Sequence, residues 1–141
     1  MSTRLFIPWF LLVSALLLAA SDESLDALKR RAATANEPRL FLEIAERQLR
    51  AADAAYSQGS LEQGKAAVAD VADYCEKAAA AAASSHKQLK HTEIKIRDLS
   101  HRLGGMLRGL SFDDREPLQA ALDRMEKARS NLLTAMFGLK S

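Results

Sequence analysis

The apolar and small residues between Leu61 and Leu110 recur at alternating intervals of three and four. They are Leu61, Gly64, Val68, Val71, Cys75, Ala78, Ala82, Ser85, Leu89, Thr92, Ile96, Leu99, Leu103, Met106 and Leu110. These intervals match the α-helical turn of about 3.6 residues, so the residues share one face of a helix. No glycine or proline occurs between Gly64 and Gly104, and β-branched residues are sparse. The register therefore predicts an all-helical chain.

The register has two structural interpretations. One is a single helix of about 50 residues, roughly 75 Å long. The other is a break at Ser84–His86, where Ser85 and Gln88 have capping-box spacing. The usual length of helices in globular proteins favours the break, whereas the uninterrupted phase favours continuity. We expect a continuous or gently kinked helix, and hence three long helices in all, or four if the chain breaks.

Helices are also predicted on both sides of this register. Asn36, Glu37 and Pro38 are typical of a helix start, and the helix over 38–58 ends before Gly59. A turn around Asp113 precedes the last helix, over about 114–138. Short loops make successive helices antiparallel. We therefore predict an antiparallel helical hairpin bundle over 37–141, preceded by a short helix or loose linker over 22–36.

The first 21 residues have the three-part pattern of a secretory signal peptide. Arg4 precedes the apolar run 5–18, and the small residues Ala19, Ala20 and Ser21 follow it. The run is short for a spanning helix, which needs roughly 20 residues. We therefore expect export to the periplasm or the extracellular space, with no transmembrane segment left after cleavage. An uncleaved N-terminal anchor is the alternative.

A basic segment stands out in a chain whose overall charge is close to neutral. The formal net charge is +2, and cleavage would remove Arg4 and no acidic residue, which leaves no global attraction to nucleic acid. Residues 87–108 nevertheless contain six basic residues against Glu93 and Asp98. The six are Lys87, Lys90, Lys95, Arg97, Arg102 and Arg108.

This basic segment has two interpretations. The first is complementary charge between packed helices together with a solvated outer face. The second is a surface for an anionic partner, such as lipid head groups or an acidic protein. Aromatic residues do not interleave with the basic ones, so nucleic acid is not an expected partner.

Residues that could support catalysis or metal binding are few. The three histidines, His86, His91 and His101, are not spaced three or four apart, as a helical metal pair requires. Cys75 is the only cysteine, so it is either a buried small hydrophobe or a thiol open to oxidation or an intermolecular disulfide. No serine-hydrolase or haem-attachment motif occurs. We therefore expect no enzyme activity, metal or cofactor.

Two segments resemble parts of known families. Residues 56–64, with Val68 and Val71 after them, resemble the turn and second helix of a tetratricopeptide repeat, which implies helix-pair packing in that one hairpin. Residues 93–99 are similar to part of the secreted helical chorismate mutases, but the rest of that pattern is missing.

The chain after the leader also resembles small exported bacterial helical proteins of unknown function. The residues that carry this resemblance are Thr92, Glu93, Ile94, Arg97, Leu99, Arg102, Leu103, the turn at Asp113 and the helix containing Glu126–Arg129. The resemblance implies an all-helical fold and nothing about activity.

These observations lead to one principal functional hypothesis and two alternatives. We expect an exported, non-enzymatic helical protein that acts through protein–protein contacts or self-association, because a long apolar seam can accept a partner helix. The alternative is a periplasmic chaperone-like or anionic-surface binding module that uses the basic face of residues 87–108. A small secreted enzyme resembling the chorismate mutases is third.

Cleavage of the leader has a spectroscopic consequence. It removes Trp9, the only tryptophan, while Tyr56 and Tyr74 remain. The natively exported product should therefore show tyrosine emission alone when its fluorescence is recorded. Tryptophan emission from that product would mean that the leader is retained.

Overall fold

A computed structural model describes residues 23–138, and the expected signal peptide lies outside the described residues. Within this range every regular element is helical, which confirms the all-α prediction. The elements are α2 (Leu25–Ala35), α3 (Pro38–Ser57), α4 (Leu61–Ser85), α5 (Leu89–Arg108), a short 3-10 helix (Phe112–Asp114) and α6 (Glu116–Phe137). Across residues 23–138, no helix combines the length and the apolar character that crossing a bilayer requires.

The expected continuous helix is wrong, because the chain reverses between α4 and α5. His86 and Gln88 adopt left-handed backbone conformations, with φ of 53° and 59°. The Ser85 hydroxyl donates to the Ala81 carbonyl and accepts from the Lys87 amide, so Ser85 closes α4 rather than capping α5. The apolar register runs on into α5 because each helix needs one buried face, and periodicity alone does not reveal the turn between them.

A smaller correction concerns the start of α3. Asn36 was expected to contribute to that helix start, but it ends α2 in a left-handed conformation, with φ of 50°. Pro38 occupies the first turn of α3 as predicted, and Glu37 is the residue before it. The segment before α3 is thus a helix joined to it by a tight turn, not a loose linker.

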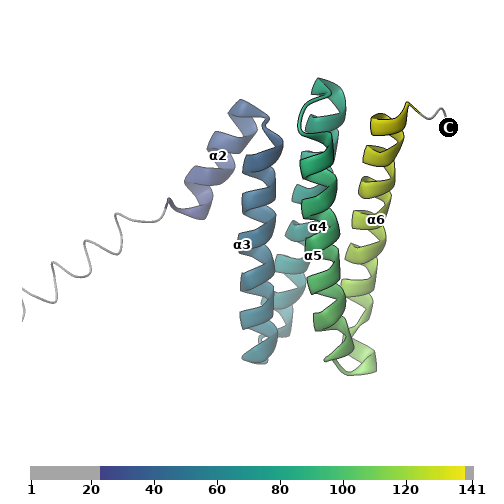
Figure 1. Cartoon of the computed structure of the whole chain (residues 1–141). Coiled ribbons are helices and arrows are strands. Elements are labelled where there is room, and N and C mark those ends of the chain that lie inside the picture. The colour runs from purple at the N-terminus through teal and green to yellow at the C-terminus, as the bar shows by residue number, and fades with distance from the viewer. Residues whose placement is uncertain (1–22, 139–141) are drawn as a thin grey trace, which may run out of the picture.

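The four long helices run antiparallel in chain order, with α2 packed against α3 (Figure 1). Around the bundle, α3 packs on α4, α4 on α6, and α6 on α5. The ring closes between α5 and α3, which contact each other much less closely than α3 and α4 do. Within the described residues the backbones of α3 and α6 do not approach each other closely, so these two helices lie on one diagonal of the bundle and α4 and α5 on the other.

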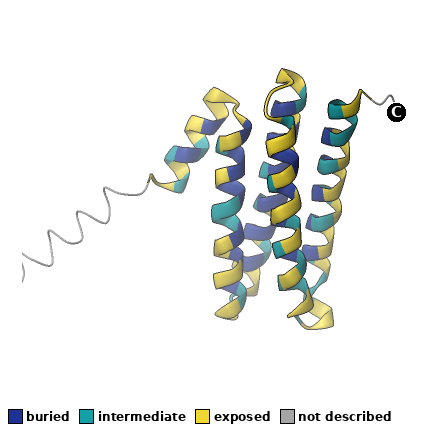
Figure 2. Ribbon diagram, viewed as in Figure 1, coloured by how far each residue is buried: buried dark blue, intermediate teal, exposed yellow. Residues whose placement is uncertain are grey.

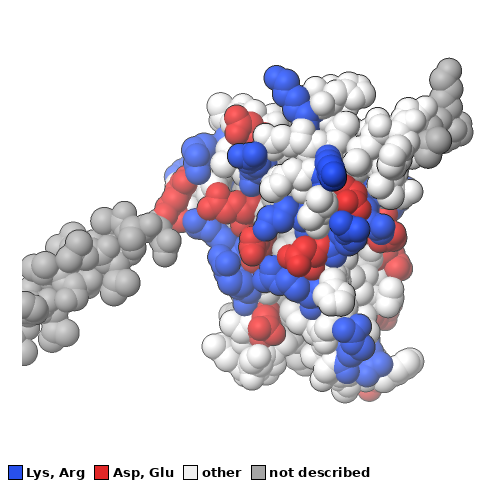
Figure 3. Space-filling view, in the orientation of Figure 1, with Lys and Arg blue, Asp and Glu red and all other residues white. Residues whose placement is uncertain are grey.

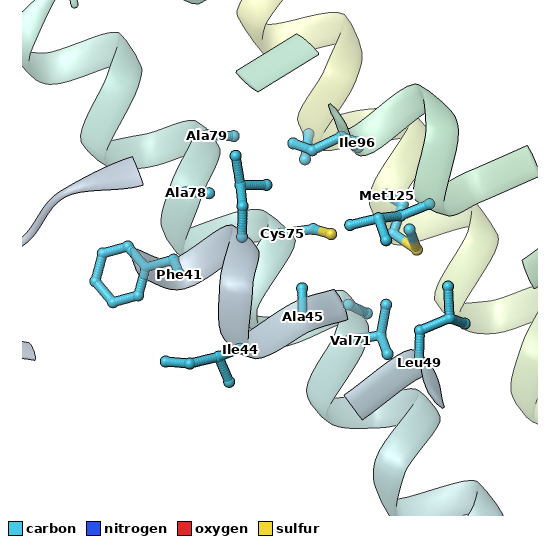
Figure 4. Close-up of a cluster of buried hydrophobic side chains, with 14 of the residues drawn as sticks. Phe41, Ile44, Ala45, Leu49, Val71, Cys75, Ala78, Ala79, Ile96 and Met125 are labelled. Atoms are coloured by element: carbon cyan, nitrogen blue, oxygen red, sulfur yellow. The ribbon is translucent and has the colours of Figure 1, made fainter. Parts of the chain in front are cut away.

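The core is built from one buried stripe on each helix (Figure 2). Six of the core positions on α4 are alanines, which allows the neighbouring helices to approach it closely. Larger side chains from the other helices fill the core between them; those fully or almost fully buried include Leu49, Ile96, Leu99, Leu103, Leu118, Met125 and Leu132. Cys75 lies among them, with its sulfur directed toward the centre of this cluster (Figure 4).

The α3–α4 hairpin depends on a close contact at Gly64. Gly59 takes the positive φ of 77° that the turn requires. Four residues into α4, Gly64 is buried against the ring of Tyr56 on α3. A Cβ at position 64 would lie 2.7 Å from a Tyr56 ring carbon, which is closer than real contacts allow. The small residue that the sequence places here therefore lets the two helices meet.

Replacement of Gly64 by alanine should lower the free energy of unfolding by about 1–3 kcal/mol, because the Tyr56 ring must move. Gly105→Ala is the matched control, since the nearest atom to its added Cβ is the end of the Arg108 side chain at 3.8 Å. In that control the higher helix propensity of alanine should raise stability by about 0.5–1 kcal/mol. Urea denaturation compares the two, and equal effects would contradict this packing.

Candidate binding face on helix α5

The structure separates the six basic residues of segment 87–108 into two groups. Lys95 and Arg102 lie on the side of α5 that faces α3, where both contact Glu46. The remaining four, Lys87, Lys90, Arg97 and Arg108, are exposed to solvent. The sequence treated the six as one surface, and the fold does not support that, because residues of α5 separated by about 100° per step point to different neighbours.

The first group forms an interhelical ion cluster. Glu46 Oε1 lies 3.2 Å from the Arg102 guanidinium, and Glu46 Oε2 lies 3.6 Å from Lys95 Nζ. Arg102 also lies 3.7 Å from Asp98 on its own helix. Burial raises the pKa of Glu46, but the Arg102 hydrogen bond and the charges of Lys95, Arg102 and Arg50 outweigh burial, so this pKa is below its ordinary value. The cluster joins α5 to α3, the neighbouring helices of the ring that contact each other least closely.

The second group forms what we call the outer stripe of α5. It consists of Lys90, Ile94, Arg97, His101 and Arg108, with Lys87 just before the helix. The intervals are three, four or seven residues, so these side chains lie along the solvent face, opposite the buried row that contains Ile96 and Leu99. In Figure 3, basic side chains lie over α5 on the face turned to the viewer, with acidic side chains among them.

The charges of the outer stripe are largely uncompensated. Among the described residues, no carboxylate lies within ion-pair distance of Lys87, Lys90 or Arg108. Arg97 lies 3.8 Å from Glu93, but Glu93 is buried and already accepts a hydrogen bond of 3.0 Å from Arg129 on α6. One acidic residue, Asp98, lies on the same exposed side of α5, four residues after Ile94 and three before His101, and its carboxylate is 3.7 Å from Arg102. Basic residues outnumber it along the stripe, which therefore presents net positive charge to solvent.

Sequence reasoning missed two residues of this region. Ile94 lies in the middle of the outer stripe with 42% of its surface exposed, and it is the one exposed large aliphatic side chain of α5. Its spacing from Lys90 and Arg97 would have identified it once the start of α5 was known. Glu46 could not have been found in this way, since it belongs to another helix and pairs with α5 only through the fold.

The acidic residues of α4 do not neutralise α5. Asp70 accepts hydrogen bonds from Gln48 at 2.6 Å and Lys29 at 3.4 Å. Asp73 and Glu76 both pair with Arg124 on α6. These acids therefore join α4 to α2, α3 and α6. Complementary charge between packed helices accounts for these three acids and for Lys95 and Arg102. It does not account for the outer stripe.

Other chemically distinctive groups give no comparable site. Burial raises the pKa of the Cys75 thiol to about 12, which favours the small-hydrophobe interpretation of this cysteine. Residues 23–138 contain no cluster of three or more histidine, cysteine or acidic side chains arranged to hold a metal ion. An open groove of about 350 Å³ lies between α4 and α6, floored by alanines. Another of about 290 Å³ lies between α3 and α5 near Tyr56 and Met106.

Comparison with known proteins does not assign this arrangement. No protein-family model, curated protein or solved structure matches the chain.

The Glu46 cluster makes stability depend on pH in a defined direction. Because the pKa of Glu46 is lower in the folded than in the unfolded chain, its contribution is complete above the unfolded value and is lost as pH falls toward the folded one. Glu46→Gln should therefore destabilise the protein by about 0.5–1 kcal/mol at neutral pH. The difference from wild type should shrink below about pH 4, as measured by urea denaturation across pH. A difference independent of pH would contradict this role.

Proposed function

We propose that this protein is a non-enzymatic helical binding protein that acts outside the cytoplasm by holding an acidic protein partner against the outer stripe of α5. The observation that carries this proposal is the stripe itself, where Lys90 and Arg97 flank the exposed Ile94 and basic residues outnumber the one exposed carboxylate, Asp98. The extracytoplasmic location rests on the sequence of residues 1–21, which precede the described range.

The composition of the stripe favours a protein partner over a lipid surface. An apolar side chain surrounded by charged ones is the usual arrangement of a protein interface, where the apolar residue is desolvated and the rim charges set orientation and association rate. Ile94 is the only large apolar residue of α5 that is exposed to this degree. A face that enters a bilayer surface instead carries an extended apolar band.

The two groups of basic residues on α5 should also differ in role. Lys95 and Arg102 are held by Glu46 and keep the α3–α5 side closed. Lys90 and Arg97 can change partners at little cost to the fold, because one has no ion pair among the described residues and the other shares an already satisfied carboxylate. A reversal of charge at these two positions removes only the 3.8 Å Arg97–Glu93 ion pair and leaves the Glu46 cluster and the Arg129–Glu93 contact in place.

The test is binding of a fluorescent acidic helical peptide to the purified protein, followed by anisotropy at low and high salt. Lys90→Glu/Arg97→Glu should weaken binding about tenfold or more, and salt should weaken wild-type binding, because the contact is electrostatic. The control Arg30→Glu/Lys127→Glu makes the same change of charge on exposed residues of α2 and α6 and should leave affinity within about threefold.

Two results would contradict the proposal. One is an equal loss of peptide affinity in the stripe variant and in the control variant, which would indicate a general effect of net charge. The other is salt-sensitive binding to phosphatidylglycerol vesicles without binding to the peptide, which would assign the stripe to an anionic lipid surface.

A further inference from the structure

The outer stripe defines the chemistry of the surface that fits it. A complementary surface carries an exposed apolar side chain, to meet Ile94, and carboxylates beside it, to meet Lys90 and Arg97. The turn between α5 and α6 of this same chain has that composition. Phe112 is 84% exposed there, and Asp113 and Glu116 are exposed next to it. Among the described residues neither carboxylate belongs to an ion pair.

We propose that the acidic partner of the outer stripe is a second copy of this chain, which docks its Phe112 turn beside Ile94. The inference rests on the proposed function, because it names the partner of the same face. In this contact Phe112 covers Ile94, while Asp113 and Glu116 face Lys90 and Arg97. Exclusion of water from the two apolar side chains supplies affinity, and the charges fix the orientation.

The turn is held in shape before any partner arrives. The Ser111 hydroxyl donates to an Asp114 carboxylate oxygen at 2.8 Å, and the Asp114 amide donates to the Ser111 carbonyl at 3.0 Å. Arg115 Nε donates to the Leu110 carbonyl at 3.0 Å, which ties the turn to the end of α5. Phe112 is therefore presented on an ordered 3-10 helix, and little conformational entropy remains to be lost on docking.

The contact has to form between different molecules. The rise of an α-helix places Ile94 about 21 Å from Arg108, the last residue of α5, and Phe112 lies beyond that end. Two copies can exchange this contact reciprocally, which closes a dimer, or make it in one direction, which continues beyond a dimer.

Sedimentation velocity on protein purified from expression of the full chain tests this inference. At low salt the wild type should form dimers or larger species as concentration rises from micromolar to millimolar, and high salt should reverse this. Phe112→Ser should weaken association roughly tenfold or more. Lys90→Glu/Arg97→Glu and Asp113→Lys/Glu116→Lys should each be monomeric alone, because turn and stripe then carry the same sign. Circular dichroism confirms that all variants remain helical.

A mixture of the two charge-reversed variants is the decisive sample. Each turn then meets a stripe of opposite sign on the other variant, so the mixture should associate although neither component does. A wild type that stays monomeric, or a mixture that stays monomeric, would overturn the inference. If the wild type is monomeric but its stripe still binds the acidic peptide, only the second copy is excluded and the proposed function stands. If both fail, both proposals fall.

Discussion

The apolar row of α5 can be buried only because the chain reverses at His86–Gln88. If α5 continued straight from α4, the two would form a rod of roughly 75 Å, and Ile96, Leu99 and Leu103 would remain exposed to solvent. The left-handed conformations of His86 and Gln88 turn α5 back, and all three side chains become buried against the other helices. The positions of the ion pairs, the grooves and the outer stripe all depend on that reversal.

The same reversal decides what each charge on α5 can do. Because α5 returns along the open side of α3, Lys95 and Arg102 meet Glu46, and Glu93 on the other side meets Arg129. These ion pairs flank the apolar row of α5 on its two sides. The charges on the third side face solvent, so the fold itself distinguishes basic residues that hold helices together from basic residues that are available to a partner.

Much of the fold could be predicted from the sequence because it depends on local patterns. Helical periodicity, Pro38 and Gly59 placed α3 and α6 correctly to within a few residues. The break at Ser84–His86 was one of the two interpretations of the sequence, but the preferred continuous helix was wrong, because the apolar phase continues across His86 and Gln88. Because the apolar periodicities of α4 and α5 are in phase, periodicity alone did not reveal the turn between the two helices.

The candidate face could be predicted only in part. The count of charges identified the basic segment. The assignment of Lys95 and Lys90 to different groups depends on where α5 begins and on which helices lie beside α5. Glu46 forms ion pairs with two of the six basic residues, and it lies on α3, far from them in sequence. Long-range pairing of this kind follows from the order of helices around the bundle, which helical periodicity does not encode.

The central claim is that the basic residues of α5 have two separate roles, and the free energy of unfolding tests it most directly. Urea denaturation of Lys95→Gln/Arg102→Gln should show a loss of about 1–2 kcal/mol, because Glu46 loses both partners. Lys90→Gln/Arg97→Gln, measured in the same way, should stay within about 0.5 kcal/mol of the wild type. Equal losses in the two variants would contradict the division on which the proposed binding face rests.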